Sequence, residues 1–203
     1  YEPIDPVRFI GNHSSGKMGI AIAEELARRG ANVHLVLGPS GFKTSLPGIH
    51  IHKVQTAEEM YQVCVREFPG ADLAVMSAAV ADYTPVETAR EKIKKSSDSL
   101  VIELTRTKDI LKSLGEMKRK GQLLVGFALE TTNEREYALS KLQSKNADMV
   151  VLNSLNDEGA GFGVDTNKIT IFEKNGAEIP YERKLKQQVA KDIVDRIVMH
   201  LNS

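Results

Sequence analysis

A short polar segment near the start of the chain could bind an anion. Residues 11–18 read GNHSSGKM, and Gly11, Gly16 and Lys17 have the spacing of a phosphate-binding P-loop. A P-loop continues with a serine or threonine that places a hydroxyl on Mg²⁺, and Met18 cannot do this. We therefore reject a P-loop. We expect the segment to enter a helix whose free N–H groups and dipole favour an anion, with an ordinary capped helix start as the alternative.

Lysine side chains form two further clusters that could bind phosphate. Lys92, Lys94 and Lys95 lie within four residues, and an ammonium group is a good point-charge partner for phosphate. Lys141 and Lys145 are four residues apart on a predicted helix, so both can reach one anion. Solvated surface lysines are the alternative reading of both clusters.

One carboxylate stands where a ligand would be expected. Asp82 follows residues 76–81 (MSAAVA), in which small side chains at the end of a predicted strand would let a ligand approach the backbone. A carboxylate at the carboxyl end of a strand can accept from a ribose, a base or an amine, or can face a metal ion. An aspartate that caps a turn is the alternative.

Two other groups of reactive side chains favour structural roles. His50 and His52 would share one face of a strand, but no third ligand is evident, so we do not expect a zinc site. Cys64 lies among apolar residues of a predicted helix and is expected to be a packed thiol rather than a nucleophile. As the lone cysteine, it excludes an intrachain disulfide and a multi-cysteine zinc site, and it fits a cytoplasmic location.

Composition narrows the class of protein. The 203 residues point to a single domain, 1–203, and 27 basic against 27 acidic residues give zero net charge. We therefore expect no nucleic-acid partner, because the global positive field is missing. No uncharged apolar run approaches the ~18 residues of a membrane helix, and nothing resembles a signal peptide, so we expect no membrane association. The start Tyr-Glu-Pro indicates that a segment precedes Tyr1.

Helices and strands are predicted to alternate. The helices fall at 17–29, 56–68, 107–120, 133–145 and 185–201, and the strands at 31–37, 49–54, 72–77, 100–104, 123–129, 148–153, 168–173 and 178–181. This order predicts an α/β protein with a doubly wound, mostly parallel sheet, in which ligands bind at the carboxyl ends of the strands.

Three segments depart from simple alternation. Residues 80–99 lack a sustained apolar period and are expected to form a long lid loop. Asn175-Gly176 predicts a hairpin within residues 160–182, which could be an edge flap or a dimer arm, before a closing C-terminal helix. Only residues 8–10 precede the first helix as a strand candidate, so we expect the first strand to lie upstream of residue 1.

Several motifs together resemble bacterial phosphopantothenoylcysteine synthetase. They are residues 2–10 (EPIDPVRFI), 12–19 (NHSSGKMG), 77–83 (SAAVADY), 92–95 (KIKK), 126–131 (GFALET) and 161–167 (GFGVDTN). The resemblance covers nearly the whole chain and implies a Rossmann-like fold. It also implies the synthetase step of coenzyme A synthesis, carried out by a domain that is often fused behind a flavin-dependent decarboxylase.

The resemblance implies a two-step ligase reaction. CTP, with Mg²⁺ or Mn²⁺, would activate 4'-phosphopantothenate to an acyl-cytidylate and release pyrophosphate. L-cysteine would then attack the acyl carbon, giving the amide and CMP. Relatives dimerise through the region containing the hairpin, so a homodimer is also expected.

The resemblance also assigns residues. Lys92 matches the catalytic lysine, Asn12 an asparagine that holds the acyl intermediate, and Arg8 an arginine linked to the second half-reaction. The positions that match nucleotide contacts are Met76, Ser77, Ala78, Asp82, Lys92, Lys108, Asp109, Ile110, Leu111, Phe127, Lys141 and Lys145. The metal ligands are not assigned.

The sequence departs from the family pattern at two points, and two other functions are alternatives. The family's Gly-Gly-Thr-like turn before Glu2 is absent, and Lys108 stands where many relatives have proline. A Rossmann oxidoreductase would need a Gly-x-Gly-x-x-Gly turn, which the sequence lacks. A non-catalytic nucleotide-binding module with the same fold is the remaining alternative.

Overall fold

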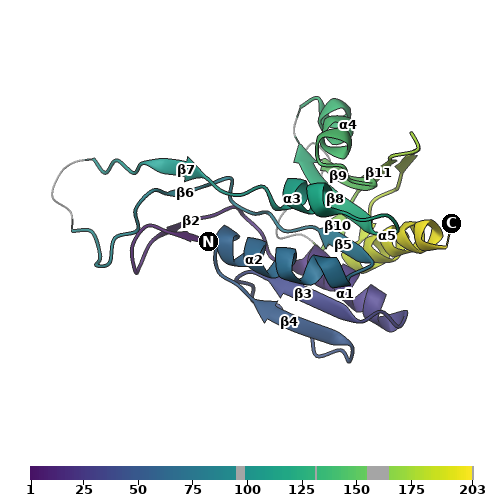
Figure 1. Ribbon diagram of the computed structural model, residues 1–203, viewed down its shortest axis with the longest axis horizontal. Coiled ribbons are helices and arrows are strands. Elements are labelled where there is room, and N and C mark those ends of the chain that lie inside the picture. The colour runs from purple at the N-terminus through teal and green to yellow at the C-terminus, as the bar shows by residue number, and fades with distance from the viewer. Residues whose placement is uncertain (95–98, 131, 155–164, 203) are drawn as a thin grey trace.

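Helices and strands alternate along most of the chain. The structure is a computed structural model that describes residues 1–94, 99–130, 132–154 and 165–202 (Figure 1). Its helices are α1 (Lys17–Arg28), α2 (Ala57–Glu67), α3 (Ile110–Met117), α4 (Glu134–Ser144) and α5 (Lys186–Leu201), with a 3₁₀ turn at Phe68–Gly70. Its strands are β1 (Glu2–Pro3), β2 (Phe9–Ile10), β3 (Val33–Leu37), β4 (Ile49–Lys53), β5 (Leu73–Met76), β6 (Tyr83–Pro85), β7 (Leu104–Arg106), β8 (Leu123–Glu130), β9 (Met149–Ser154), β10 (Thr166–Asn167), β11 (Ile169–Glu173), β12 (Glu178–Pro180) and β13 (Lys184–Leu185).

The central sheet is mixed. Its strand order is β12-β11-β9-β8-β5. Strands β5, β8 and β9 run parallel to one another, and β11 pairs antiparallel with both β9 and β12. A separate two-stranded parallel sheet is formed by β3 and β4. The α/β class is therefore confirmed. The predicted hairpin at Asn175-Gly176 is present as β11 and β12, and it continues the central sheet at one edge.

The alternation of side chains along each strand builds a core on both faces of the sheet. Val125 and Val151 point toward α1 and α5, whereas their neighbours Leu124 and Val150 point toward α2, α3 and α4. All four are fully buried. This two-sided burial explains why the strands read as continuous apolar runs. It also leaves the strand ends as the exposed edge where polar groups can gather.

Polar side chains cap the N-termini of α2 and α3. Thr56 caps α2 by accepting a hydrogen bond from the Glu59 N–H at 3.1 Å. Thr107, predicted to cap the next helix, does not; Asp109 caps α3 by accepting from the Lys112 N–H at 2.9 Å. The Thr107 hydroxyl instead donates to the Ala81 carbonyl. Across the residues described here, no helix has the length and apolar character needed to span a membrane.

An arm extends from the layered core (Figure 1). We define the arm as residues 1–10 together with the described parts of 83–106. Within it, β6 pairs antiparallel with β7, so the predicted loop at 80–99 begins with a strand and the strand predicted at 100–104 starts four residues later. Both strands are only three residues long, which is too short for a period of two to be detected.

Candidate active site

The polar segment at residues 11–16 lies at the carboxyl ends of β3 and β5. The Ser40 hydroxyl, just after β3, donates to the Ser15 carbonyl at 2.8 Å. The Asn12 side-chain amide donates to the Val80 carbonyl, beyond the end of β5, at 3.0 Å. A Cβ added at Gly19 would come 2.9 Å from the Ser77 hydroxyl. The predicted anion segment therefore occupies the strand edge at which α/β proteins bind ligands.

The lysine at the start of α1 already has a partner. Gly16, with φ +76°, precedes α1 in the left-handed region that glycine adopts most readily, and α1 then begins at Lys17. The Lys17 ammonium lies 2.5 Å from the Asp165 carboxylate, and it holds the pKa of that carboxyl below its usual value. The backbone of this helix start, rather than the Lys17 charge, is thus available to an anion.

A buried carboxylate organises the base of the arm. Asp5 Oδ1 accepts from the backbone N–H of Val7 at 2.8 Å and of Arg8 at 2.9 Å. Its Oδ2 accepts from Arg8 Nε at 2.9 Å, from Arg8 Nη2 at 2.5 Å and from the Ile93 N–H at 3.2 Å. The bond with Arg8 is the main reason that the pKa of Asp5 lies far below its usual value, although burial opposes it.

This network joins two of the predicted catalytic segments. Arg8 Nη2 also donates to the Ile93 carbonyl at 2.9 Å, so the segment next to Lys92 is held by both partners of the Asp5–Arg8 pair. The Ala89 N–H donates to the Ile4 carbonyl at 3.0 Å and extends the contact along the arm. The Lys92 side chain is exposed and makes no ion pair with any residue in the described part of the chain. Its backbone is therefore anchored while its ammonium group is available.

Residues predicted to bind nucleotide lie at the end of β5 and beside it. Met76 ends β5, followed by the half-buried Ser77 and the exposed Ala78. The Asp82 carbonyl accepts from the Thr107 N–H at 3.0 Å, which brings the start of α3 next to this edge. The Asp82 carboxylate itself is exposed, and within the described ranges no hydrogen bond or ion pair engages it. It is thus free to meet a ligand.

The segment that leads into α3 contains four more predicted nucleotide contacts. Lys108 lies 2.7 Å from the Glu58 carboxylate and 4.5 Å from the centre of the Tyr61 ring, so it leans toward α2. Asp109 caps α3 and its Oδ2 accepts from Lys145 Nζ at 2.7 Å. Burial opposes ionisation of Asp109, yet Lys145 and the Lys112 N–H hold its pKa below the usual value.

The remaining predicted contacts divide between the core and the strand edge. Ile110 is buried, and Leu111 packs so closely on Gly126 that a Cβ there would come 2.8 Å from a Leu111 methyl group. Lys141 Nζ donates to the Phe127 carbonyl at 2.9 Å. Lys141 and Lys145, expected to reach one anion, therefore bind different acceptors in the structure.

Some of the remaining predictions agree with the structure, and others concern residues outside those that it describes. Cys64 is buried, which raises the pKa of its thiol to about 11, in line with a packed role. His50 and His52 share one face of β4, as predicted. Lys95, Thr131 and residues 161–164, which belong to the quoted motifs, lie outside the described residues.

Asp5 is the functional candidate that the sequence reading missed. Asp5 lies within the motif of residues 2–10, and the resemblance assigns it no role. A signal was present: in Asp-Pro-x-Arg an aspartate can accept from the N–H groups two and three residues on, and the arginine can return to pair with it. The bond to Ile93, 88 residues away, is visible only in the fold.

Comparison with known proteins identifies the family. Residues 1–201 match the DNA/pantothenate metabolism flavoprotein C-terminal domain family. The chain is 53% identical over 197 residues to a "Cysteine/Cysteine sulfinic acid decarboxylase" of an unknown prokaryotic organism, covering 97% of the chain and 55% of that relative. It is 45% identical to the "Coenzyme A biosynthesis bifunctional protein CoaBC" of Bacillus subtilis (strain 168), covering 91% of the chain and 46% of that relative. The chain thus spans about half the length of these curated relatives.

Solved structures agree. The crystal structure of the C-terminal domain of a coenzyme A biosynthesis bifunctional protein CoaBC is 43% identical with a TM-score of 0.84, covering 99% of the chain and 90% of that structure. A Cab2 mutant in complex with phosphopantothenate-cysteine shares the fold at 17% identity, with a TM-score of 0.70 and coverage of 100% and 85%. The resemblance drawn from the motifs is confirmed: the chain belongs to the family of the DNA/pantothenate metabolism flavoprotein C-terminal domain.

Proposed function

We propose that this domain is a phosphopantothenate–cysteine ligase. One observation carries the proposal: the three catalytic candidates lie on segments that hydrogen bonds hold at the base of the arm and at the adjoining strand edge. Asp5 and Arg8 bind the backbone next to Lys92, and Asn12 binds the backbone beyond β5. The names of the relatives, CoaBC and a Cab2 complex with phosphopantothenate-cysteine, support the same reaction.

The first half-reaction would join the pantothenate carboxylate to the α-phosphate of CTP. A carboxylate oxygen attacks the α-phosphorus, the bond to the bridging oxygen of the β-phosphate breaks, and pyrophosphate leaves. Negative charge grows on the α-phosphoryl oxygens, where a preorganised cation is worth most. The exposed ammonium of Lys92, on an anchored backbone, is suited to this role once the arm lies against the nucleotide.

The second half-reaction would transfer the acyl group to cysteine. The cysteine amine attacks the acyl carbon, the C–O bond to the phosphate of CMP breaks, and the amine loses a proton. The Asn12 amide is the candidate to hold the acyl intermediate, since it offers both a donor and an acceptor. Its present bond to the Val80 carbonyl fixes its orientation at the strand edge. Arg8 is the candidate to orient the second substrate.

Nucleotide would bind along the ends of β5 and β8. Met76, Ser77 and Ala78 bring backbone groups close, and the start of α3 adds a helix N-terminus beside Asp82. Phe127 lies further along β8, where its carbonyl accepts from Lys141 of α4. CTP is proposed as the co-substrate from the family resemblance.

Mg²⁺ would supply charge neutralisation on the phosphates of the nucleotide. This ion takes oxygen ligands, keeps several waters, and is typically bound through one or two carboxylates and the substrate phosphates. The exposed Asp82 carboxylate, which has no partner among the residues that the structure describes, fits such a requirement, so we propose it as the protein's ligand or as the acceptor of a hydrogen bond from a ribose hydroxyl.

We also propose the Rossmann-like arrangement. In the described residues β3 pairs only with β4, and β5 pairs only with β8, so each has one open edge. The residues of β5 are only half-buried, whereas most of the described side chains of β8 and β9 are buried. A strand preceding Tyr1 that lies between β3 and β5 would complete the order β4-β3-x-β5-β8-β9 and the phosphate site.

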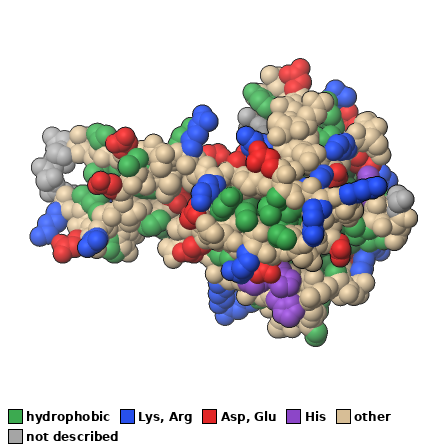
Figure 2. All heavy atoms as spheres, viewed as in Figure 1, with side chains coloured by type: hydrophobic (Ala, Val, Ile, Leu, Met, Phe, Trp, Pro, Cys, Tyr) green, Lys and Arg blue, Asp and Glu red, His purple; other side chains and the backbone are tan. Residues whose placement is uncertain are grey.

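Larger assemblies are part of the proposal. The length of the relatives supports an N-terminal flavin-dependent decarboxylase domain on the same polypeptide, and a cytoplasmic location would suit coenzyme A synthesis. A homodimer would cover exposed apolar side chains. Those of the arm include Phe9, Val86, Leu100 and Val101, of which Val101 is 89% exposed, and Figure 2 shows hydrophobic side chains along the arm. We propose the hairpin region, residues 160–182, as a flap or a second dimer contact. We also propose that the segment containing Lys92 acts as a lid over the active site.

Pyrophosphate release tests the function. The chain, extended upstream to include the proposed first strand, would be given 4'-phosphopantothenate, Mg²⁺ and either CTP or ATP, with and without L-cysteine. We expect CTP-dependent pyrophosphate release, with CMP and the cysteine amide forming when cysteine is present. Binding of CTP without release under any of these conditions would instead establish the non-catalytic nucleotide-binding module.

A further inference from the structure

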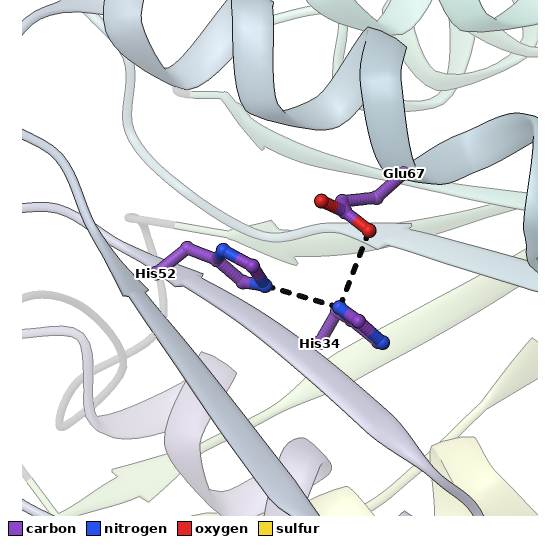
Figure 3. A group of neighbouring side chains, drawn as sticks. All are labelled: His34, His52 and Glu67. Carbon is purple, nitrogen blue, oxygen red and sulfur yellow. Dashed lines mark hydrogen bonds and ion pairs between the residues drawn. The ribbon is translucent and has the colours of Figure 1, made fainter.

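A cluster of imidazole and carboxylate groups lies outside the proposed active site. The parallel pairing of β3 with β4 places His34 beside His50, and the period of two places His50 and His52 on the same face. Glu67, at the end of α2, approaches this face from above, so that its carboxylate and the rings of His34 and His52 converge (Figure 3). Three elements thus contribute one donor group each.

The donor atoms have the spacing of a metal site. His34 Nδ1 lies 3.0 Å from His52 Nε2 and 3.4 Å from Glu67 Oε2. All three donor atoms lie within 4.8 Å of one another. Tetrahedral zinc with bonds of about 2.0–2.1 Å separates neighbouring ligand atoms by roughly 3.3 Å. Two of the separations already match, and rotation of the Glu67 side chain can shorten the third.

Neighbouring side chains orient Glu67 and engage the flanking His50. Arg66 binds Glu67 Oε1, with Arg66 Nε at 2.9 Å, and leaves Oε2 directed at His34. His50 Nε2 is engaged with the Asn32 side-chain oxygen at 2.9 Å, so His50 flanks the trio with its ring centre 5.3 Å from that of His34. Such outer contacts fix ligand orientation in metal sites. The partly exposed position of His34 leaves room for a water ligand.

We propose that His34, His52 and Glu67 bind one Zn²⁺ ion or a similar late first-row divalent cation. Two imidazole nitrogens and one carboxylate oxygen suit zinc, copper or nickel, whereas Mg²⁺ prefers oxygen ligands alone. By sequence alone, His50 and His52 have no evident third ligand. The fold supplies His34 from the adjacent strand and Glu67 from α2, and leaves His50 outside the set.

The position of this site separates it from the proposed ligase chemistry. His34 is the second residue of β3, His52 is the fourth residue of β4, and Glu67 is the last residue of α2, so the cluster lies within the length of the two strands. The active-site candidates lie beyond the carboxyl ends of β3 and β5. A bound ion would join β3, β4 and α2, and this two-stranded sheet has no other strand beside it in the described residues. Because a two-stranded sheet is marginal alone, the bound ion would stabilise the native state.

Titration calorimetry with ZnCl₂ on the tag-free chain tests the proposal. We expect one equivalent of Zn²⁺ to bind, with affinity falling at least about 100-fold in His34→Gln and in His52→Gln. Glu67→Gln keeps the side-chain size and should also weaken binding. His50→Gln is the matched control, since it removes a neighbouring imidazole that is not a ligand, and its affinity should stay within about threefold of wild type.

A second readout detects the ion in its site directly. Co²⁺ in place of Zn²⁺ should give the visible absorption bands of a four-coordinate site, and Zn²⁺ should raise the thermal unfolding midpoint of the wild-type chain but not of His34→Gln. Far-UV circular dichroism of each variant establishes that it is folded. Binding that is absent in the wild type, that persists in folded His34→Gln and His52→Gln, or that is lost equally in His50→Gln would overturn the proposal.

Discussion

The core and the arm are held together by different forces. In the core, β8, β9 and β11 contribute side chains that are almost completely buried between two helical layers, among them Leu124, Val151 and Ile171 at 0% exposure. In the arm, apolar side chains such as Val101 remain exposed around a cavity of about 350 Å³. The arm depends on directed hydrogen bonds, and five of them converge on Asp5.

This difference separates stability from catalytic geometry. Burial is non-directional and is shared among many side chains, so the core sets the free energy of unfolding. Hydrogen bonds to one carboxylate are directional, so the position of the segment next to Lys92 depends largely on the Asp5–Arg8 pair. Substitutions in the two regions should therefore affect different measurements.

Lys92→Gln should have the largest effect on activity. Loss of a preorganised charge at the α-phosphate is expected to lower the rate of pyrophosphate release by about 100- to 1,000-fold. Because Lys92 is exposed and unpaired in the described residues, urea unfolding should give the wild-type free energy. Steady-state pyrophosphate assays and equilibrium unfolding measure both.

Asn12→Asp serves as the companion variant. It should still form acyl-cytidylate but transfer the acyl group poorly to cysteine, which quenched single-turnover analysis would reveal. Normal cysteine-dependent turnover in either variant would refute the roles assigned to these residues.

Ile193→Ala should have the largest effect on stability. Ile193 is fully buried on α5 against the central sheet, and truncation of such a side chain costs about 2–5 kcal/mol of unfolding free energy. Activity per folded molecule should remain near wild type at a temperature where the variant is folded. Val101→Ala in the arm is the control. An equal loss of stability in both variants would remove the distinction between the two regions.

Asp5→Asn should lower activity by about 10- to 100-fold, because small displacements of catalytic groups are costly. It should also change the pH dependence of stability. The folded-state pKa of Asp5 is depressed, so its contribution to stability is complete above the unfolded value of about 3.9 and is lost as pH falls from there toward the depressed value. Acid unfolding of the variant should lack this component. Identical acid titrations of variant and wild type would show that Asp5 does not hold the arm.

Gly115→Ala should reverse the usual effect of replacing a helical glycine. Alanine normally favours a helix, but a Cβ here would lie 1.9 Å from the Lys145 carbonyl oxygen, which is backbone and cannot move aside alone. We expect about 1–3 kcal/mol of destabilisation in thermal unfolding. Gly41→Ala, where a Cβ meets nothing within 4 Å, is the control and should have little effect. A gain in stability at Gly115 would contradict the close packing of α3 on the turn after α4.

Lys108→Gln should have the smallest effect. Lys108 binds the exposed Glu58 carboxylate on α2, and exposed pairs contribute little. We expect the KM for CTP to rise by no more than about fivefold in steady-state assays. A larger rise, without change in kcat, would show that Lys108 leaves Glu58 and binds the nucleotide.

Local patterns were sufficient for most of the core. The helices at α1, α2, α4 and α5 and the strands β8, β9 and β11 were predicted to within about two residues, because long apolar periods and capping residues act within a few positions of the chain. The short strand β6 and the Asp109 cap were missed and β7 was placed four residues too early, because three residues carry no period and several residues near a helix start can cap it.

The sequence by itself determined the α/β class, the two-sided core and the motifs that mark the family, since each depends on residue types that are close along the chain. Only the tertiary structure decided that Asp5 binds Ile93, that Lys141 and Lys145 turn to different acceptors, and that His34 and Glu67 join His52. These contacts link residues up to 88 positions apart, and their distances depend on how whole strands and helices pack, which no local pattern encodes.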